Sequence, residues 1–267
     1  LIHESDAVPG RVNRFAARFA RRIGIAFVAA EAQFPKGKSV LVGIPIRKRI
    51  LGGDIRIAKE DLEINSNLPV IAFLGASQGA QKINDAALEI LKELTEEYEV
   101  LHQTGETHFE EVRGEASVVL ERGHNDRYHA FGFLDERGMR DLYNAADLIV
   151  ARAGASTIFE IAAWGKPAIL IPLMQAAQDH QRKNAYEYAA RGAAVVLEEP
   201  NLAPHLLLAE IRKVFAKPDA MQRMREAAQK FSRIDSAELI ARELLKLAFH
   251  STGIAPAEEK PYLELNQ

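Results

Sequence analysis

Two glycine-containing turns are the segments of this sequence whose residue types best suit a phosphate group. They are Gly75-Ala76-Ser77-Gln78-Gly79-Ala80 and Arg152-Ala153-Gly154-Ala155-Ser156-Thr157, and each lies between an apolar run and an amphipathic segment. Small residues let the backbone approach a ligand, and the N-terminus of the following helix offers unpaired N–H groups and a partial positive charge. Each turn could equally be a tight strand-to-helix connection capped by Ser77, Ser156 or Thr157. Neither is a P-loop, because no Gly-Lys-Ser/Thr follows.

Polar side chains near the two turns suggest what else a ligand could meet there. Glu160 follows the second turn. A carboxylate there either accepts hydrogen bonds from both hydroxyls of a ribose or simply stabilises the helix by its negative charge near the N-terminus. The segment 175–184 carries amides that could bind sugar hydroxyls, or it is a solvated loop with Asp179 as helix cap. His180 lies within this segment, and a lone histidine is more often structural than catalytic. Together the two turns and the carboxylate favour a nucleotide site.

Basic residues elsewhere leave two interpretations open. Arg47, in Gly43-Ile44-Pro45-Ile46-Arg47, could pair with a phosphate, although Lys48 and Arg49 make a plain basic patch equally consistent. Residues 9–23 show helical spacing, with Val12, Phe15, Phe19 and Ile23 on one side and five arginines on the other. That helix could touch anionic lipid, although such helices more often pack their apolar side on a sheet. Just before it, His3 and Glu4 could form an acid/base pair or be polar residues at a strand end.

The elements that must position these residues alternate between strand and helix from residue 68 onward. We expect strands at 69–74, 99–103, 128–134, 147–151, 167–173 and 194–197, with helices at 78–97, 137–145, 156–164, 180–190 and 206–215. Continuous apolar strands that alternate with helices predict a parallel sheet covered on both faces, a doubly wound Rossmann-like domain. Ligands of such sheets bind at the carboxyl ends of the strands, where both turns lie.

Composition bounds the class of protein. The 267 residues carry a formal net charge of −3, which does not favour a nucleic-acid binder. The sequence has no cysteine, so disulfides and cysteine-ligated zinc are excluded. Runs such as 70–76 and 167–174 are far shorter than the roughly 18–20 apolar residues of a spanning helix. Because the chain opens at Leu1 on what resembles the end of a strand, we expect it to be part of a longer protein.

The motifs, taken in this order, resemble the MurG family of peptidoglycan glycosyltransferases. The resemblance spans about residues 3–202 and is most specific over 151–184; it lies in HESDAVPGRVNR, GIPIR, GASQGAQKIN, ARAGASTIFEIAAWGKPAILIPL, DHQRKNA and GAAVVLEE. It implies an α/β chain of the GT-B fold, with a complete Rossmann-like C-terminal lobe and only part of the N-terminal lobe. The implied division is 1–44 for the N-terminal remnant, 45–250 for the donor lobe with a last helix that crosses back, and 251–267 for a flexible tail.

By this resemblance the donor lobe binds UDP-N-acetylglucosamine without a metal or other cofactor. Glu160 would bind the ribose hydroxyls, the backbone at Leu134 would contact uracil, and Gln181 with His180 would contact the sugar. The start of the second turn's helix, together with Ser77, would contact the diphosphate or sugar. This helix start comprises Ala155, Ser156, Thr157, Ile158 and Phe159. Arg47 would add positive charge. Asp6 and Ser5 stand where the family usually has Asn and Gln, and Ala76 replaces a glycine. Asp6 is included among the donor contacts, although an acidic residue there departs from the family pattern.

The implied activity is inverting transfer of N-acetylglucosamine to the C4 hydroxyl of the muramyl sugar of lipid I, giving lipid II at the cytoplasmic face of the bacterial membrane. This reaction serves peptidoglycan synthesis, and with it cell shape and division. No catalytic residue is assigned, because the family's candidate base would precede Leu1, and we expect this chain alone to bind donor but to transfer poorly. The alternatives are another GT-B UDP-sugar transferase or epimerase, a donor-binding half that needs a partner chain, and a basic lipid-surface module at residues 11–22.

Overall fold

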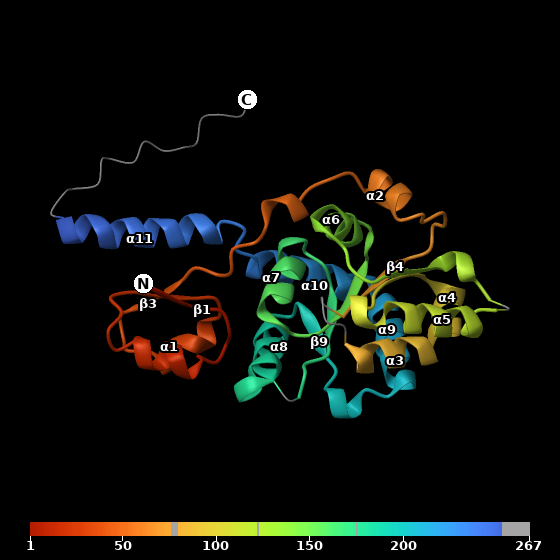
Figure 1. Cartoon of the computed structure of the whole chain (residues 1–267), viewed down its shortest axis with the longest axis horizontal. Coiled ribbons are helices and arrows are strands. Elements are labelled where there is room, and N and C mark those ends of the chain that lie inside the picture. The colour runs from red at the N-terminus through yellow and green to blue at the C-terminus, as the bar shows by residue number, and fades with distance from the viewer. Residues whose placement is uncertain (76–79, 122, 175, 253–267) are drawn as a thin grey trace.

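Two parallel sheets of different size organise the chain, as the computed structural model shows (Figure 1). The structure describes residues 1–75, 80–121, 123–174 and 176–252. The small sheet has the order β1-β2-β3, formed by Ile2–Glu4, Ile23–Ile25 and Ser39–Leu41. The larger sheet has six strands: β4 (Val70–Leu74), β5 (Glu99–Gln103), β6 (Tyr128–Phe131), β7 (Leu148–Ala151), β8 (Ala168–Leu170) and β9 (Ala194–Val196).

The strand order of the larger sheet is β6-β5-β4-β7-β8-β9, and every pairing in it is parallel. The chain moves outward from β4 to β6, returns to the centre, and then moves outward on the other side from β7 to β9. The predicted doubly wound, Rossmann-like domain is therefore confirmed. Its topological switch point lies between β4 and β7.

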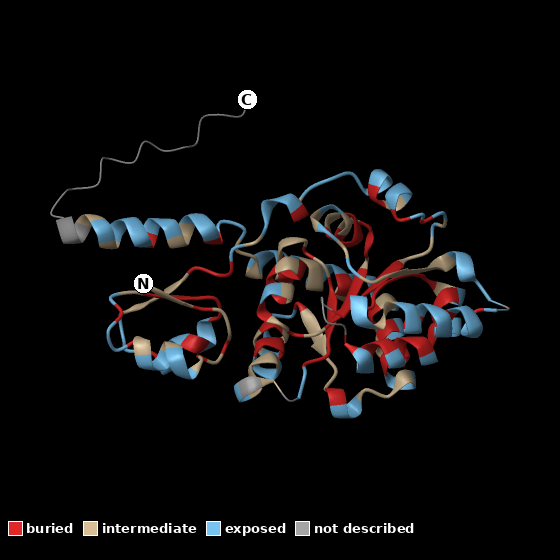
Figure 2. Cartoon of the chain, in the orientation of Figure 1, coloured by how far each residue is buried: buried red, intermediate tan, exposed pale blue. Residues whose placement is uncertain are grey.

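Helices cover both faces of the larger sheet, because apolar residues along its strands alternate between two apolar clusters. Val70, Ala72 and Leu74 face a cluster that includes α6 (Glu136–Ala145), α7 (Ala155–Ala163), α8 (His180–Ala190) and α10 (Pro218–Phe231). Ile71 and Phe73 face α3 (Gln81–Glu89), α4 (Leu91–Glu97), α5 (Phe109–Val119) and α9 (Pro204–Phe215). Figure 2 shows these strands as the buried centre of the molecule.

The small sheet joins the first of these clusters through the segment that follows β2. Ala26 and Phe27 are buried with residues of α7 and α10. The last helix, α11 (Ser236–Thr252), lies beside the small sheet, where Glu243 pairs with Arg22 at 3.1 Å (Figure 1). Residues 251 and 252, which the sequence assigns to a tail, end this helix, and residues 253–267 lie outside the described residues.

Three expectations about the elements need correction. The helix predicted at 9–23 is only α1 (Arg11–Ala16), and Ile23 belongs to β2, where it is fully buried. The long helix predicted from residue 78 is two helices, because Ile90 (φ −110°, ψ 10°) interrupts it. Sequence analysis missed α5 and α10, whereas α11 is the last helix that the resemblance implied for 45–250. The helix α2 (Ile55–Asp61) lies in segment 51–67, whose mixed polar sequence fits either a helix or a linker. In α5 only Val112 and Ala116 are buried, which is too few apolar positions for a clear period.

Buried His102 makes stability depend on pH. Its Nδ1 lies 3.0 Å from the Tyr128 hydroxyl and its Nε2 lies 3.0 Å from Asn84 Oδ1. Burial lowers the pKa of His102 to about 3, whereas an unfolded histidine titrates near pH 6.5. The unfolded chain therefore binds a proton that the folded chain does not, and stability falls as the pH drops below about 6.5.

We expect urea unfolding between pH 7 and pH 4 to show a loss of up to about 1.4 kcal/mol per pH unit from this residue. His102→Gln should start less stable, because it loses these contacts, but its stability should fall less steeply with pH. His124→Gln, at an exposed position, is the matched control and should keep the parent slope. Equal slopes for the parent and His102→Gln would contradict the assignment.

Candidate functional site

The two glycine-containing turns follow neighbouring strands at the switch point of the larger sheet. Leu74, the last residue of β4, pairs with Ala151, the last residue of β7. Gly75 and Arg152 therefore leave the same edge of the sheet side by side, at the position where open α/β sheets bind ligands. Ser77 and Ala76 lie outside the described residues, so the role predicted for Ser77 stays a prediction.

The start of α7 presents backbone N–H groups at this edge. Gly154 is the N-cap residue, no side chain caps the helix, and the N–H of Ile158 donates to the Gly154 carbonyl at 3.0 Å. The N–H groups of Ala155, Ser156 and Thr157 therefore have no partner within the helix. The alternative that Ser156 or Thr157 caps the helix is wrong, and three amides remain for an anion.

Two residues predicted to contact a donor are turned away from this edge. The side chains of Ile158 and Phe159 are fully buried in the cluster between the sheet and its helices. Their N–H groups lie beyond the first three helical positions, where helical hydrogen bonds occupy the backbone. The prediction is corrected for Ile158 and Phe159, which hold α7 in place instead of facing a ligand.

Glu160 is held at the site by two donors from other elements. Its Oε2 accepts a hydrogen bond from the hydroxyl of Tyr143 in α6 at 3.1 Å, and its Oε1 pairs with Arg47 at 3.3 Å. Burial raises the pKa of Tyr143 well above its usual value, with the Glu160 carboxylate as a further cause, so Tyr143 stays a donor. Two carboxylate oxygens offer about four acceptor positions, so Glu160 can still accept two further hydroxyls. Arg47 is half exposed and reaches the site from the segment that joins the two sheets.

The loop after β8 has an unusual backbone. Gln178 and Asp179 both have positive φ, at 56° and 59°, which is uncommon for residues other than glycine. Asp179 makes no side-chain cap and instead pairs with Arg182 at 2.7 Å, so the capping interpretation is wrong. Gln181 accepts a hydrogen bond from the Leu173 N–H at 3.1 Å, which leaves its amide NH₂ for a ligand.

The N-terminal loop faces this loop across a cavity of about 410 Å³. Asp6 Oδ1 accepts a hydrogen bond from buried Asn184 in α8 at 2.8 Å, and Asp6 and His180 both line the cavity. Glu4 is buried and accepts hydrogen bonds from the N–H groups of Asp6 and Gly10, each at 3.0 Å. Glu4 therefore orders this loop, and His3 contacts the Gly43 carbonyl, so the acid/base pair is not formed. The structure thus brings Asp6, His180 and the Gln181 loop together.

Leu134 lies farther from the switch point than the other predicted residues. It follows β6, the outermost strand on its side, and packs partly buried against the core beside the first turn of α6. Asp135 caps that helix by accepting a hydrogen bond from the Gly138 N–H at 2.8 Å. The backbone contact predicted for Leu134 stays a prediction.

Three residues that hold the site together were missed by the sequence analysis: Tyr143, Asn184 and Glu199. Tyr143 donates to Glu160, Asn184 donates to Asp6, and Glu199 accepts from Arg152 and Met174. Each partner lies 17 or more positions away in the chain, so no local spacing connects them. The available signal was a polar residue inside a segment whose other buried positions are small or apolar, as with Asn184 in α8.

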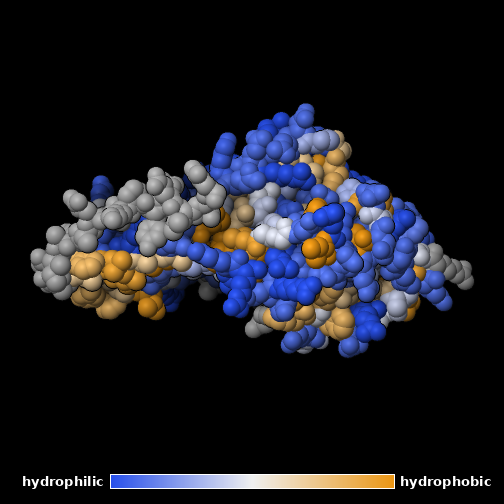
Figure 3. Space-filling view, turned by 90° about the horizontal axis from the view of Figure 1, so that it is seen from above, coloured by the Kyte–Doolittle hydropathy of each residue, from blue (hydrophilic) through white to orange (hydrophobic). Residues whose placement is uncertain are grey.

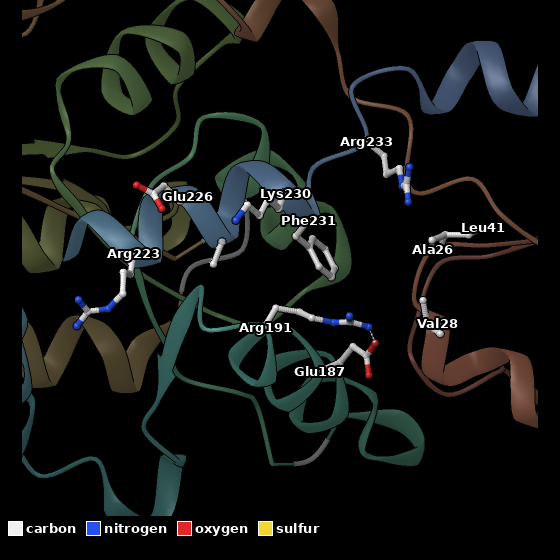
Figure 4. Close-up of a pocket in the computed structure, with 11 residues that line it drawn as sticks. Ala26, Val28, Leu41, Glu187, Arg191, Arg223, Glu226, Lys230, Phe231 and Arg233 are labelled. Carbon is white, nitrogen blue, oxygen red and sulfur yellow. Dashed lines mark hydrogen bonds and ion pairs between the residues drawn. The ribbon is translucent and has the colours of Figure 1, made fainter. Parts of the chain in front are cut away.

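A second cavity between the sheets lies away from the strand ends. It has a volume of about 510 Å³. Leu41 of β3 and two residues that follow β2, Ala26 and Val28, line one side, and the second half of α8 and α10 line the other. Figure 4 shows Arg191 and Phe231 directed toward the small-sheet residues, with Glu187 paired to Arg191 at 3.4 Å. Of the predicted site residues that the structure describes, Asp6 and His180 line the other cavity, and none lines this one.

The residues that the structure describes contain neither a cluster of metal ligands nor a membrane-spanning helix. No group of three or more His, Asp or Glu side chains there could hold a metal ion. Among the same residues, no helix has the length and apolarity that crossing a bilayer requires.

The chain is similar to known proteins over more than half of its length. Residues 70–240 match the model of the glycosyltransferase family 28 C-terminal domain. Two relatives carry the name UDP-N-acetylglucosamine--N-acetylmuramyl-(pentapeptide) pyrophosphoryl-undecaprenol N-acetylglucosamine transferase. The one from Halalkalibacterium halodurans is 35% identical over 92% of this chain and 68% of its own length. The one from Geobacter sulfurreducens is 38% identical over 92% of this chain and 66% of its own length.

Solved structures show the same fold. A crystal structure of MurG from Acinetobacter baumannii matches with a TM-score of 0.73 at 24% identity, covering 92% of this chain and 66% of that one. UDP-GlcNAc 2-epimerase from Neisseria meningitidis matches with a TM-score of 0.59 at 15% identity, covering 87% and 63%. The chain thus spans about two thirds of the length of the proteins it resembles.

Proposed function

This chain belongs to glycosyltransferase family 28, and from that membership we propose that it binds UDP-N-acetylglucosamine for the inverting transfer of N-acetylglucosamine to a lipid-linked muramyl acceptor. The acceptor in this proposal is the undecaprenyl-pyrophosphoryl-muramyl-pentapeptide named in the relatives, and the reaction serves peptidoglycan synthesis. The observation that supports it most is the carboxylate of Glu160 beside the uncapped start of α7 at the switch point. A carboxylate suits a ribose and free helix amides suit a diphosphate.

In this proposal each group has a distinct task. Glu160 accepts hydrogen bonds from the ribose hydroxyls and keeps its bond from Tyr143. The free N–H groups at Ala155, Ser156 and Thr157 hold the diphosphate, and Arg47 adds a positive charge beside them. As UDP leaves, these donors stabilise the negative charge that develops on the diphosphate. They take the role that a metal ion has in other phosphate-binding sites.

The sugar end of the donor would lie toward the cavity between the two loops. The C4 hydroxyl oxygen of the acceptor attacks the anomeric carbon from the side opposite UDP, and the bond between that carbon and the diphosphate oxygen breaks. The proton of the hydroxyl passes to a general base, which we do not assign to a residue of this chain. In this proposal Asp6, His180 and Gln181 position the N-acetylglucosamine.

Calorimetry of the folded chain with UDP-N-acetylglucosamine tests the proposal directly. We expect binding that is tighter than for UDP-glucose or GDP-mannose, because in this proposal Gln181 contacts the sugar and the backbone at Leu134 contacts uracil. Adding lipid I then tests whether the bound sugar is transferred. A folded chain that binds none of these nucleotides contradicts the proposal, and turnover of the donor without acceptor favours an epimerase instead.

We further propose that the chain acts at the cytoplasmic face of the bacterial membrane and that the segment around α1 contacts the lipid. Val12, Phe15 and Phe19 are 79%, 63% and 75% exposed, and the two rings contact each other at 5.6 Å. Arginines surround them: Arg11, Arg14, Arg18, Arg21 and Arg22. Exposed aromatic side chains among cations favour an anionic lipid surface. Figure 3 shows further apolar side chains at this end of the molecule. Leu244 and Leu245 of α11 are also exposed.

Flotation with liposomes that contain phosphatidylglycerol should recover the chain, whereas pure phosphatidylcholine should not. Phe15→Ser with Phe19→Ser should reduce the floated fraction at least fivefold, because both aromatic contacts are removed. Val118→Ser, at a 74% exposed position of α5 on the larger lobe, is the matched control and should float like the parent. Unchanged flotation of the double variant, or equal loss in the control, contradicts this assignment.

A further inference from the structure

Buried Glu199 links three segments at the carboxyl edge of the larger sheet. It begins the short 3-10 helix η6 (Glu199–Asn201), and its side chain is 4% exposed. Its Oε1 accepts from Arg152, just after β7, at 3.3 Å, and lies 3.0 Å from Nζ of Lys82 in the first turn of α3. Its Oε2 accepts a hydrogen bond from the Met174 N–H, in the loop after β8, at 3.1 Å.

The Glu199 carboxylate is ionised in this setting. Burial by itself raises its pKa, but the Met174 N–H and the Lys82 and Arg152 cations outweigh burial and bring the pKa below its ordinary value. Arg152 is itself largely buried and donates to the Ile171 carbonyl at 3.2 Å. A charged group fixed in this way keeps one position, because moving it would leave buried partners unpaired.

The loop after β8 depends on this carboxylate for its position. Two consecutive amides of the loop are held, the Leu173 N–H by Gln181 and the Met174 N–H by Glu199. Four residues later the backbone turns through Gln178 and Asp179, both with positive φ, before α8 begins. A loop that holds two uncommon backbone conformations needs fixed attachments on both sides. Met174 is the attachment on the side of β8.

We infer that Glu199 is a positioning residue that sets the preference of the site for a nucleotide sugar over the bare nucleotide. Glu199 itself touches no donor; it fixes the loop that leads into His180 and Gln181, the first residues of α8, against the end of β7. This inference rests on the proposed function, in which that loop contacts the sugar while Glu160 and the start of α7 contact the nucleotide. Loosening the loop should therefore weaken sugar recognition and leave nucleotide recognition nearly intact.

Calorimetry with UDP-N-acetylglucosamine and with UDP separates these effects. For Glu199→Gln we expect at least tenfold weaker binding of UDP-N-acetylglucosamine and less than threefold weaker binding of UDP. Glu198→Gln is the matched control: it removes the neighbouring carboxylate, which accepts from exposed Tyr186 at 2.8 Å, and both affinities should stay within twofold. Equal weakening of both ligands by Glu199→Gln, or no weakening, overturns the inference.

Hydrogen exchange of the ligand-free protein provides a test that does not depend on the donor. Peptides covering residues 171–174 should exchange faster in Glu199→Gln than in the parent, whereas peptides of β4 should not change. If Glu199→Gln does not fold, Glu199→Asp keeps the charge but shortens its reach, and should show the same pattern at smaller amplitude. A parent that binds neither UDP nor UDP-N-acetylglucosamine contradicts the proposed function. In that case hydrogen exchange alone decides whether Glu199 anchors the loop. Unchanged exchange in Glu199→Gln overturns the inference.

Discussion

Replacing Glu160 by alanine should weaken the binding of UDP-N-acetylglucosamine by about two orders of magnitude. Two hydroxyls that donate to a carboxylate contribute about 1.5 kcal/mol or more each, and about 1.4 kcal/mol corresponds to a factor of ten in affinity. The substitution also leaves the buried Tyr143 hydroxyl without its acceptor and releases Arg47 from its ion pair. Calorimetry on the folded variant measures the effect.

Glu187→Ala is a closely matched control for Glu160→Ala. Both side chains are about equally exposed, at 18% and 17%, and each pairs with an arginine at a similar distance, 3.4 Å and 3.3 Å. Glu187 lies in the second half of α8, away from the strand ends, so its replacement should leave donor binding unchanged. The parent should also bind UDP more tightly than 2′-deoxy-UDP, and Glu160→Ala should lose that difference. If Glu160→Ala still prefers UDP, Glu160 does not bind the ribose.

The framework of the larger lobe could be predicted because its strands are buried on both faces. Val70–Leu74 and Leu148–Ala151 are continuous apolar runs, and each precedes a turn of small residues. Such runs identify parallel strands without any long-range information. Since the topology then fixes where the strands end, the position of Glu160 and the start of α7 near the switch point followed from the sequence.

The contacts that give the site its shape could not be predicted in the same way. Asn184 reaches Asp6 across 178 positions of the chain, and Glu199 reaches Lys82 and Arg152 from a third segment. Periodicity describes neighbours along one element and contains nothing about such pairs. Ile158 and Phe159 were assigned to the site because they lie in the motif, whereas the helical period turns their side chains into the core.

The segment around α1 shows a second limit of periodicity. Val12, Phe15, Phe19 and Ile23 have helical spacing, yet only the first two belong to the helix. Ile23 is fully buried in β2, and the arginines between them do not distinguish one element from the other. Phe15 and Phe19 are exposed instead of packed on a sheet, and this exposure makes the lipid contact testable.

Replacing Phe27 by alanine should cost about 3–5 kcal/mol of unfolding free energy, the range for deleting a buried aromatic ring. Phe27 is fully buried where the small sheet meets the larger lobe, and its ring contacts Phe159 of α7 at 5.5 Å and Phe231 of α10 at 5.8 Å. For a chain of this size, about 3 kcal/mol corresponds to a melting temperature lower by about 10 °C.

Phe19→Ala is the control for the loss of an aromatic ring as such. Phe19 is 75% exposed, so this variant should change stability by less than about 0.5 kcal/mol. Because Phe159 precedes Glu160 in α7, a cavity left by Phe27 also removes support from the helix that carries the carboxylate. Phe27→Ala should therefore weaken donor binding several-fold even below its melting temperature. Equal melting temperatures for Phe27→Ala and Phe19→Ala would mean that these three rings do not hold the small sheet against the larger lobe, and that polar contacts such as Asp6–Asn184 carry this attachment instead.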